Sequence, residues 1–420
     1  MGSFAPPPGT ADIFEAEAGN WRALESAARK IFSRYGYGEL RTPVFEYTEV
    51  FQKGLGNETE VVRKEMYTFE DRGGRSLTLR PEGTAGVMRA LSNTDVMNGV
   101  EQRVYYIGPM FRGERPAAGR RRQFHQIGVE NVGRCAPLLD AECIAMLAAF
   151  LRSIGLDGFT IDINTRGSIA DRAPAEAELR RFFADKLDCM CEDCRTRYER
   201  NIWRMLDCKQ EKCREIIAGV PDVVSFFSPA SQEYFNSVRK ALDMLKVPYR
   251  INPNLVRGLD YYVHTVFEVT HPALGEQTAI AGGGRYELYL PGETRPLPGV
   301  GFASGVERLL LCREAAGIAE KSEMTPDVYM IGLGKDAVVA NLALAEKWRS
   351  LGLSVALELE ERSFKAQMRA ANKSAAPFAV IRGESEMAGN CVVVKNMSDG
   401  SQETLSLDQL NAFVQDKLKK

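Results

Sequence analysis

Two strand-like runs joined by a basic loop constrain the fold of this chain most. The runs are Val104–Arg112 and Arg122–Glu130, and residues 113–121 between them carry three arginines. Because successive side chains of a strand point to opposite faces, alternate residues of the second run share one face. That face carries the aromatic ring of Phe124, the amide of Gln126 and the carboxylate of Glu130, and Gly128 adds no side chain to it. Glycines 108 and 128 predict room for a small solute between the two strands.

The surrounding pattern predicts an α+β domain built on an antiparallel sheet. Helices and strands do not alternate regularly before residue 160, which disfavours a doubly wound parallel sheet. We expect helices over residues 19–35, 82–92 and 138–153. Strands are expected over residues 61–70, 75–80 and 103–112.

Two further changes of pattern divide the chain into three parts. Residues 165–245 are rich in charge and mostly helical in pattern, and strand-like residues return at 248–270. We therefore expect a helical insertion, 165–245, that interrupts a first domain formed by 1–164 and 246–323. Residues 326–420 alternate strands (327–333, 353–359, 378–381, 391–394) with helices (335–351, 363–375, 407–418), which predicts a small C-terminal α/β domain.

Charge and cysteine usage narrow the class of protein. The formal net charge is −2, so a contact with nucleic acid requires local basic patches. No run reaches the roughly 18 apolar residues of a membrane span, and the start does not resemble a secretory signal. The nine cysteines are an odd count for a secreted protein, so we expect reduced thiols and a cytoplasmic location.

Five of the cysteines cluster between residues 189 and 213. Cys191-x2-Cys194 followed by Cys208-x4-Cys213 has the form of two thiolate pairs for zinc. The spacing within the second pair is loose for a zinc ribbon. Free thiols in a helical insertion are therefore the favoured interpretation, with a zinc site as the alternative.

Two segments near the middle suit a pocket for a small polar aromatic solute beside a phosphate. Arg257–Tyr262 supplies an arginine and two tyrosines, and Ala281–Glu287 supplies a glycine run. Glycines 282–284 do not form a phosphate-binding loop, because neither Gly-Lys-Ser/Thr nor a dinucleotide fingerprint accompanies them. A P-loop kinase and a Rossmann enzyme are therefore disfavoured.

These segments, with three others, resemble the class II aminoacyl-tRNA synthetases. Thr42-Pro43 before Val44–Glu46 is similar to motif 1, Arg112 with Glu114 to motif 2, and Gly301–Leu309 to motif 3. Within this class, four further segments resemble those of the histidyl-tRNA synthetases: Leu79–Thr84, Gln123–Gln126, Arg257–Tyr262 and Ala281–Glu287. The resemblance to that family runs from about Gly9 to the C-terminus.

The resemblance implies activation of histidine by ATP with Mg²⁺, followed by transfer to histidine tRNA. Arg112 would hold the α-phosphate, Arg308 the γ-phosphate, and Arg257 would lie near the α-phosphate as a third catalytic arginine. A guanidinium suits these roles because it stays charged and offers a planar fork of donors. Phe124 would stack on the adenine and Glu114 would accept from its amine. Arg120 completes the expected ATP-binding set.

The resemblance also implies a histidine pocket. Neutral imidazole carries one N–H and one bare nitrogen, so it needs an acceptor and a donor. Glu130 and Tyr262 resemble the pair for that task. Glu82, Thr84 and Gln126 would hold the ammonium group, and Tyr261 and Gly283 complete the set. The alternative interpretation is structural: an Arg257–Asp260 ion pair and a packed Tyr262 ring.

Motif 1 implies a homodimer, and the C-terminal domain implies binding of the anticodon. Lys365, Arg369 and Lys373, four residues apart, would share one helix face, either as phosphate contacts or as a solvated surface. Many bacterial relatives have a glutamine that reads the extra 5′ guanosine of histidine tRNA where this chain has Ala117, so we expect less dependence on that nucleotide.

The main rival is non-catalytic. Synthetase-like regulatory subunits of ATP phosphoribosyltransferase, which act in histidine biosynthesis, typically lack the C-terminal domain and have eroded catalytic motifs. This chain keeps both. A class II-like ligase with another acceptor is the third alternative, and the C-terminal domain disfavours it.

Overall fold

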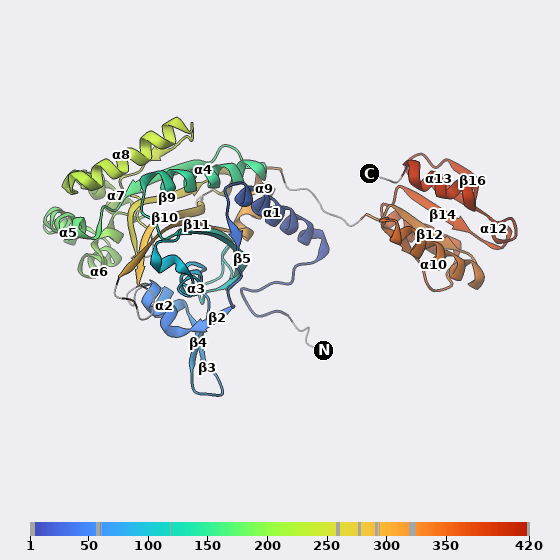
Figure 1. The fold of residues 1–420 in the computed structure, drawn as a ribbon, viewed down its shortest axis with the longest axis horizontal. Helices are drawn as coiled ribbons and strands as arrows, with labels where there is room; N and C mark the ends of the chain where they lie inside the picture. The colour runs from blue at the N-terminus through green and yellow to red at the C-terminus, as the bar shows by residue number, and fades with distance from the viewer. Residues whose placement is uncertain are drawn as a thin grey trace. The chain divides into compact units, whose positions relative to one another are not determined.

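The computed structural model describes residues 5–55, 59, 61–117, 119–257, 261–275, 279–289, 293, 295–318 and 325–417. The chain forms two compact units, residues 1–321 and 322–420 (Figure 1). No helix among the described residues is long and apolar enough to cross a membrane.

An eight-stranded sheet forms the centre of the first unit. Its strand order is β1-β5-β6-β11-β10-β9-β7-β8. The six central strands pair antiparallel, and only the short edge strands β1 and β8 pair parallel. The predicted antiparallel sheet is therefore confirmed. The strands are β1 (Gly38–Glu39), β5 (Gln102–Phe111), β6 (Gln123–Val132), β7 (Thr160–Thr165), β8 (Arg250–Ile251), β9 (Tyr262–Thr270), β10 (Ala279–Tyr289) and β11 (Pro296–Gly305).

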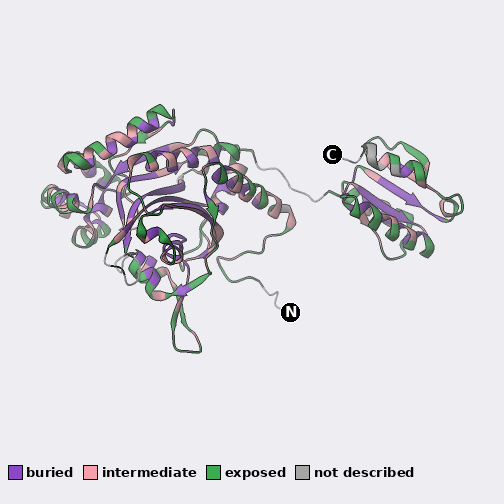
Figure 2. Cartoon of the chain, viewed as in Figure 1, coloured by how far each residue is buried: buried purple, intermediate pink, exposed green. Residues whose placement is uncertain are grey.

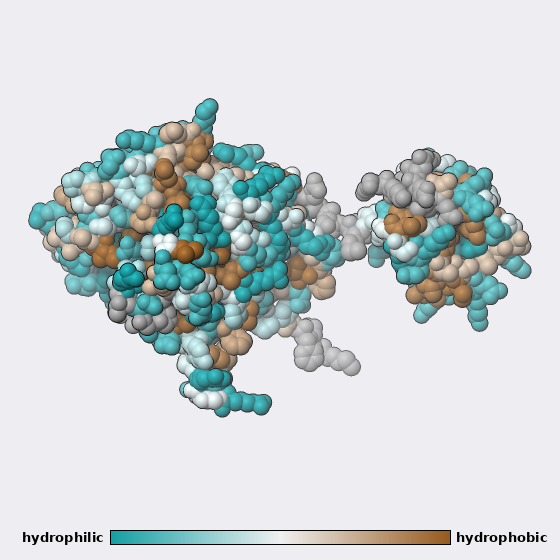
Figure 3. Space-filling view, viewed as in Figure 1, coloured by the Kyte–Doolittle hydropathy of each residue, from teal (hydrophilic) through white to brown (hydrophobic). Residues whose placement is uncertain are grey.

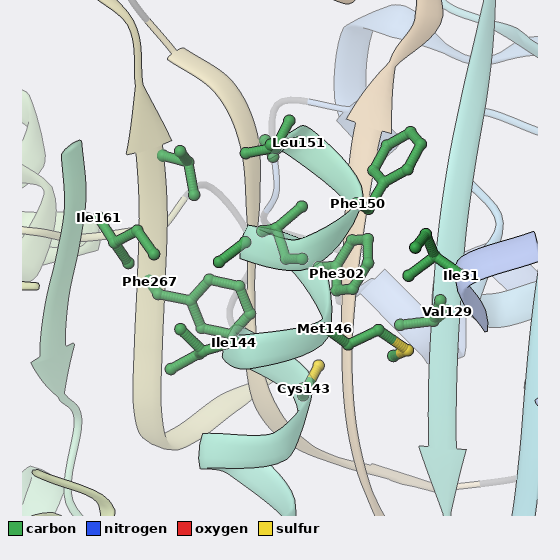
Figure 4. Close-up of a cluster of buried hydrophobic side chains, with 14 of the residues drawn as sticks. Ile31, Val129, Cys143, Ile144, Met146, Phe150, Leu151, Ile161, Phe267 and Phe302 are labelled. Atoms are coloured by element: carbon green, nitrogen blue, oxygen red, sulfur yellow. The ribbon is translucent and has the colours of Figure 1, made fainter. Parts of the chain in front are cut away.

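Four helices pack together with one face of this sheet in the main hydrophobic core. They are α1 (Glu15–Arg34), α4 (Pro137–Ser153), α8 (Pro229–Met244) and α9 (Val306–Ala315). Apolar residues recur at helical spacing along α1, which directs one stripe inward. Figure 4 shows Ile144 and Phe150 of α4 beside Phe267 of β9 and Phe302 of β11. In Figure 2 the sheet is mostly buried, and exposed residues lie along the outer sides of the helices.

The remaining elements before β5 form a small sheet and short helices. The strand order is β2-β4-β3. The predicted strand over 61–70 is half wrong, because residues 61–65 form a π-helix with Val61 buried against α2. The elements are β2 (Phe45–Tyr47), β3 (Tyr67–Glu70), β4 (Ser76–Leu79), α2 (Thr48–Leu55), η1 (Val61–Glu65), α3 (Thr84–Leu91) and η2 (Asp95–Asn98).

Residues between β7 and β8 are helical, as predicted, and have a separate small core spanning residues 175–227. Trp203 donates to Glu176 at 2.8 Å, and the guanidinium carbon of Arg166 lies 4.0 Å from the Trp203 ring centroid. The helices before α8 are α5 (Ile169–Phe183), η3 (Leu187–Cys189), α6 (Glu192–Arg200), η4 (Ile202–Met205), α7 (Glu211–Ile217) and η5 (Val223–Phe226). A further short turn, η6 (Pro272–Leu274), follows β9.

The second unit is a five-stranded mixed sheet with helices. Its order is β13-β12-β14-β15-β16; β12 pairs parallel with β13 and β14, and the last three strands pair antiparallel. The predicted partly parallel sheet is confirmed. The elements are β12 (Val328–Gly332), α10 (Lys335–Ser350), β13 (Val355–Leu357), α11 (Phe364–Lys373), β14 (Phe378–Arg382), α12 (Glu384–Ala388), β15 (Cys391–Asn396), β16 (Gln402–Ser406) and α13 (Leu407–Lys417).

Candidate active site

A cavity of about 180 Å³ opens against the central strands and the start of α3. It brings together six of the seven residues predicted for histidine binding, and also Arg112 and Arg257. Gly283 is not part of its wall; a Cβ at Gly283 would meet the Gly301 carbonyl and the Phe267 ring, and Gly282 lines the cavity instead. The lining residues are Glu82, Thr84, Tyr106, Arg112, Gln126, Glu130, Arg257, Tyr261, Tyr262, Gly282, Tyr286, Gly301, Phe302 and Ala303.

Glu82, just before α3, and Glu130 of β6 supply two buried carboxyl groups. Glu82 accepts from the backbone N–H groups of Thr84 at 2.8 Å and Ala85 at 2.7 Å, which are unsatisfied donors at a helix start. Burial raises the pKa of Glu82. The hydroxyl groups of Thr84 and Tyr286 donate to Glu130 at 2.7 and 2.8 Å.

Burial raises the pKa of Glu130 to about 8. The hydrogen bonds from Thr84 and Tyr286 act in the opposite direction, and the nearby Glu82 carboxyl raises the pKa further. An ionised Glu130 is therefore costly until a positive or donating group reaches it. A ligand that brings an N–H donor would remove that cost.

The glycines of the β5–β6 pair do not leave room for a solute, so that prediction is wrong. A Cβ on Gly128 would lie 2.4 Å from the Tyr106 ring, and one on Gly108 would lie 2.4 Å from Arg80 Nη2. The protein's own side chains fill both spaces. Tyr106 pairs with Gly128 across the strands, so knowledge of the register would have identified this wall of the cavity.

Gly301 makes room for a carboxyl group of the protein. A Cβ there would lie 2.1 Å from Glu130 Oε2. Gly301 pairs with Glu130 across β11 and β6. The glycine therefore allows the Glu130 carboxyl group to lie flat against β11 inside the cavity.

Arg257 is held by an ion pair that the sequence did not reveal. Its Nη1 donates to Oε2 of Glu268 at 2.6 Å, and its guanidinium packs on Gly282. The predicted alternative partner, Asp260, lies outside the described residues. Within the described chain, Nε of Arg257 and Oε1 of Gln126 are buried without a hydrogen-bond partner. A polar ligand in the cavity could therefore bond to both atoms.

A second cavity, of about 400 Å³, contains all five residues predicted for ATP binding. The guanidinium carbon of Arg112 lies 5.3 Å from the Phe124 ring centroid, within cation–π range. Arg308 Nε donates to the Ala279 carbonyl at 2.6 Å. The lining residues are Val61, Glu65, Arg112, Glu114, Gly119, Arg120, Arg121, Phe124, Gln126, Arg204, Gly305, Glu307 and Arg308.

Two charged residues that line the second cavity, Arg204 and Glu307, were not among the predicted site residues. Arg204 comes from η4, in the helical insertion, and only the fold brings it beside the motif 2 strand. Glu307 accepts from the His125 backbone N–H at 2.9 Å and lies 3.1 Å from its Nδ1. That carboxylate therefore joins the start of α9 to β6.

The two cavities share Arg112 and Gln126 and therefore meet at these side chains. The first cavity has carboxyl groups and tyrosines, which suit a small solute with N–H donors. The second is lined by arginines, which suit a polyanion. A group bound in the first cavity can thus react beside Arg112 with an anion bound in the second.

Two parts of the chain match the profiles of known protein families. The histidyl-tRNA synthetase family profile matches residues 9–309, and an anticodon-binding domain profile matches residues 327–417. A histidine–tRNA ligase of Solidesulfovibrio magneticus is 46% identical over 98% of this chain and 97% of its own length. The relative of the same name from Pelotomaculum thermopropionicum is 43% identical, with the same coverage of both chains.

Solved structures give the same result. The apo histidyl-tRNA synthetase of S. aureus superposes with a TM-score of 0.80 at 34% identity, covering 98% of this chain and 99% of that one. A Bacillus halodurans structure titled as an ATP phosphoribosyltransferase regulatory subunit/histidyl-tRNA synthetase has a TM-score of 0.65 at 18% identity, over 91% and 98% of the chains, and shares the fold. The profile match over most of the chain and the full-length identities together show that this chain belongs to the histidyl-tRNA synthetase family.

Proposed function

We propose that this protein activates histidine with ATP and transfers it to the terminal ribose of histidine tRNA. The observation that carries the proposal is the junction of the two cavities at Arg112. In the first step, a carboxylate oxygen of histidine attacks the α-phosphorus, and the bond to pyrophosphate breaks. In the second, a ribose hydroxyl attacks the histidyl carbonyl carbon and AMP leaves.

Histidine occupies the first cavity in this proposal. Glu130 accepts from the imidazole N–H, and the Tyr262 hydroxyl donates to the bare nitrogen. Glu82, Thr84 and Gln126 hold the ammonium group. The unsatisfied Gln126 Oε1 supports this role, because it is a buried acceptor without a partner among the described residues. Tyr261 contacts the Tyr262 ring at 4.7 Å between centroids and limits the space around the imidazole.

ATP occupies the second cavity, with its α-phosphate at Arg112. Arg257 approaches the same phosphate from the first cavity, and Arg308 holds the γ-phosphate. Positive groups fixed in advance stabilise charge that builds on the phosphoryl oxygens during transfer. Phe124 stacks on the adenine and Glu114 accepts from its amine. Arg120, 3.7 Å from Glu114, completes this end of the cavity.

The carboxylate of Glu65 fits a magnesium ion that arrives with the nucleotide. Glu65 lines the second cavity, and Mg²⁺ is commonly held by one or two carboxylates together with substrate phosphates. When bound, the ion would neutralise phosphate charge. The arginines of the same cavity would orient the phosphates.

The second unit supplies the tRNA contact in this proposal. Lys365, Arg369 and Lys373 lie on the exposed face of α11, and the opposite face buries Gln367 and Ala371. An exposed row of cations suits the phosphate backbone of an anticodon stem. The matched anticodon-binding profile covers this helix.

We also propose that the protein acts as a homodimer in the cytoplasm. Exposed aromatic side chains gather on β2 and β3: Phe45, Tyr47, Tyr67 and Phe69. An apolar patch is visible beside the β3–β4 hairpin in Figure 3. Such surfaces mark association sites. None of the nine cysteines, all of which lie in the described part of the chain, is in a disulfide, which suits a reducing compartment.

The test is exchange of pyrophosphate into ATP, compared across all twenty amino acids. Exchange with histidine alone, followed by charging of histidine tRNA, supports the proposal. A folded protein without exchange would favour the regulatory-subunit alternative, and binding to ATP phosphoribosyltransferase would be measured next. That alternative is weakened by the assembled catalytic arginines and by the matched anticodon-binding domain.

A further inference from the structure

Four cysteines of the helical insertion converge on one point. The sulfur atoms of Cys191, Cys194, Cys208 and Cys213 all lie within 4.8 Å of one another. Cys191 and Cys208 are 3.8 Å apart between sulfurs, and none of the four is in a disulfide. Tetrahedral zinc with Zn–S bonds near 2.3 Å requires sulfur–sulfur separations of about 3.8 Å. The cluster therefore has the size of a tetrathiolate metal site.

We propose that these four cysteines bind one structural zinc ion. Zinc coordination by four cysteines closes the metal's shell and leaves no position for a substrate, so the ion has no catalytic role. On binding, the four thiols release their protons and form four Zn–S bonds. The resulting centre carries a formal charge of −2, and basic residues adjoin three ligands: Arg195, Lys209 and Lys212.

Local backbone geometry favours the site. Cys191 is the N-cap residue of α6 and Cys194 lies in its first turn, which places two sulfurs at the helix start. The Cys191 backbone N–H donates to Cys213 Sγ at 3.3 Å. Cys208 precedes α7 and Cys213 lies within it, which accounts for the longer spacing of the second pair. The spacing that weakened the zinc interpretation from sequence is therefore accommodated by the fold.

The insertion also needs a cross-link. Its separate core spans only residues 175–227, and apolar cores of that size are often supplemented by a metal. Cys194, Cys208 and Cys213 are buried within this core, and Cys191 is half-buried at its edge. One ion would tie α6, the chain after η4 and α7 together.

This cross-link reaches the second cavity through η4. The segment between Cys194 and Cys208 contains Trp203, which is buried in the insertion core, and Arg204, which lines the cavity. Zinc would fix the ends of this segment and so fix where Arg204 lies. This consequence for ATP binding rests on the proposed function, whereas the metal site itself does not.

The test is zinc content of the full-length protein, purified with reductant and without chelator. One zinc per chain is expected by elemental analysis, with none in Cys194→Ser or Cys208→Ser. Cys189→Ser is the matched control, because Cys189 is exposed and outside the cluster, and it should keep the ion. Full zinc in Cys194→Ser would overturn the proposal.

Cobalt substitution keeps the proposal testable if the serine variants do not fold. Wild-type protein stripped of zinc and given Co²⁺ should show the visible bands of tetrahedral cobalt thiolate, as should Cys189→Ser. Reduced protein that takes up neither metal, or that forms disulfides within the cluster in their place, would overturn the site. Zinc removal should also raise KM for ATP; absence of exchange in zinc-replete wild type would contradict the proposed function alone.

Discussion

Arg257 and Glu268 form a 2.6 Å ion pair that directs a guanidinium into the first cavity. Arg257 precedes β9 and Glu268 lies within it, while Gly282 of β10 supplies the flat surface beneath the guanidinium. Glu268 pairs with Gly282 across the two strands. The Glu268 carboxylate therefore fixes the Arg257 guanidinium, and the lack of a side chain at Gly282 leaves the space that the guanidinium occupies.

Replacing Arg257 with alanine should slow histidine-dependent pyrophosphate exchange by about 100-fold or more, because a pre-positioned donor to the phosphoryl group is lost. Arg250→Ala is the control, since Arg250 pairs with Asp162 outside both cavities and should leave exchange unchanged. The exchange rate of Glu268→Gln should lie between those of Arg257→Ala and Arg250→Ala, because the glutamine amide oxygen still accepts from Arg257. If the Arg257→Ala variant exchanged pyrophosphate at the wild-type rate, Arg257 would have no role in the reaction.

Glu130 should make the unliganded protein less stable as pH rises from about 5 to 8. Its pKa is raised in the folded state from near 4.5 to about 8, so in that window the folded chain binds the proton that the unfolded chain has lost. Stability falls by up to about 1.4 kcal/mol per pH unit for one such proton. Denaturant midpoints of the first unit measured at pH 5 and pH 8 should differ less in Glu130→Gln than in wild type.

Glu130→Gln should also raise KM for histidine, because a neutral amide is a weaker acceptor from the imidazole N–H than a carboxylate is. Tyr286→Phe removes a hydrogen bond that lowers the pKa of Glu130, and should move the pH dependence of histidine binding upward. Tyr289→Phe, at the exposed end of the same strand, is its control. Equal pH slopes in all these proteins would contradict the role of Glu130.

Arg308→Ala should raise KM for ATP by about 10- to 100-fold, as expected for loss of a hydrogen bond to a charged group. The KM for histidine should change little, because Arg308 lines only the second cavity. Arg313→Ala, on the same helix and outside both cavities, is the matched control. A parallel rise in KM for histidine would show that Arg308 acts through the fold rather than on the nucleotide.

Asp140→Asn should lower the free energy of unfolding of the first unit by about 3–5 kcal/mol, because it leaves a buried guanidinium without its counter-charge. Asp140 and Arg285 are fully buried and 2.6 Å apart, and Asp140 also accepts from Thr265 at 2.6 Å. Glu15→Gln removes the partner of an exposed arginine, Arg22, and should change stability little. Chemical denaturation of wild type, Asp140→Asn and Glu15→Gln measures the free energy of unfolding and so compares the buried ion pair with the exposed one.

Removal of the extra 5′ guanosine from the tRNA should reduce charging less in this protein than in a glutamine-bearing relative. Ala117 is exposed in the loop between β5 and β6, where it exchanges backbone hydrogen bonds with Arg120, and its methyl group cannot bond to a base. Ala117→Gln should increase the dependence. Equal loss of charging in the relative and in this protein would refute the prediction.

The sequence predicted the site better than the contacts within it. The arginines of motifs 2 and 3 and the carboxyl groups of the histidine segments were predicted from the resemblance to a known family, and the structure brings them together. Tyr106, Glu268 and Arg204 were missed. The positions of Tyr106 and Glu268 depend on strand register, and that of Arg204 depends on how the insertion packs. Local periodicity encodes neither the register nor this packing.

The errors in secondary structure have similar causes. Residues 61–65 have strand-like composition but bury Val61 in a helical turn against α2, so tertiary packing overrides propensity. β16 was not predicted, because its residues are mostly exposed and polar and only the pairing with β15 defines it. The glycines of β5 and β6 were placed correctly, but the residues that fill their space come from distant positions.

The wall shared by the two cavities would make the binding of one proposed substrate depend on the binding of the other. Arg112 and Gln126 border both spaces, so a ligand that orders these side chains on one side changes the wall presented to the other. Linkage requires such an effect to be reciprocal: if histidine changes the affinity for ATP by some factor, ATP changes the affinity for histidine by the same factor. Under the proposed function, Arg112 and Gln126 would couple the binding of the amino acid to the binding of the nucleotide.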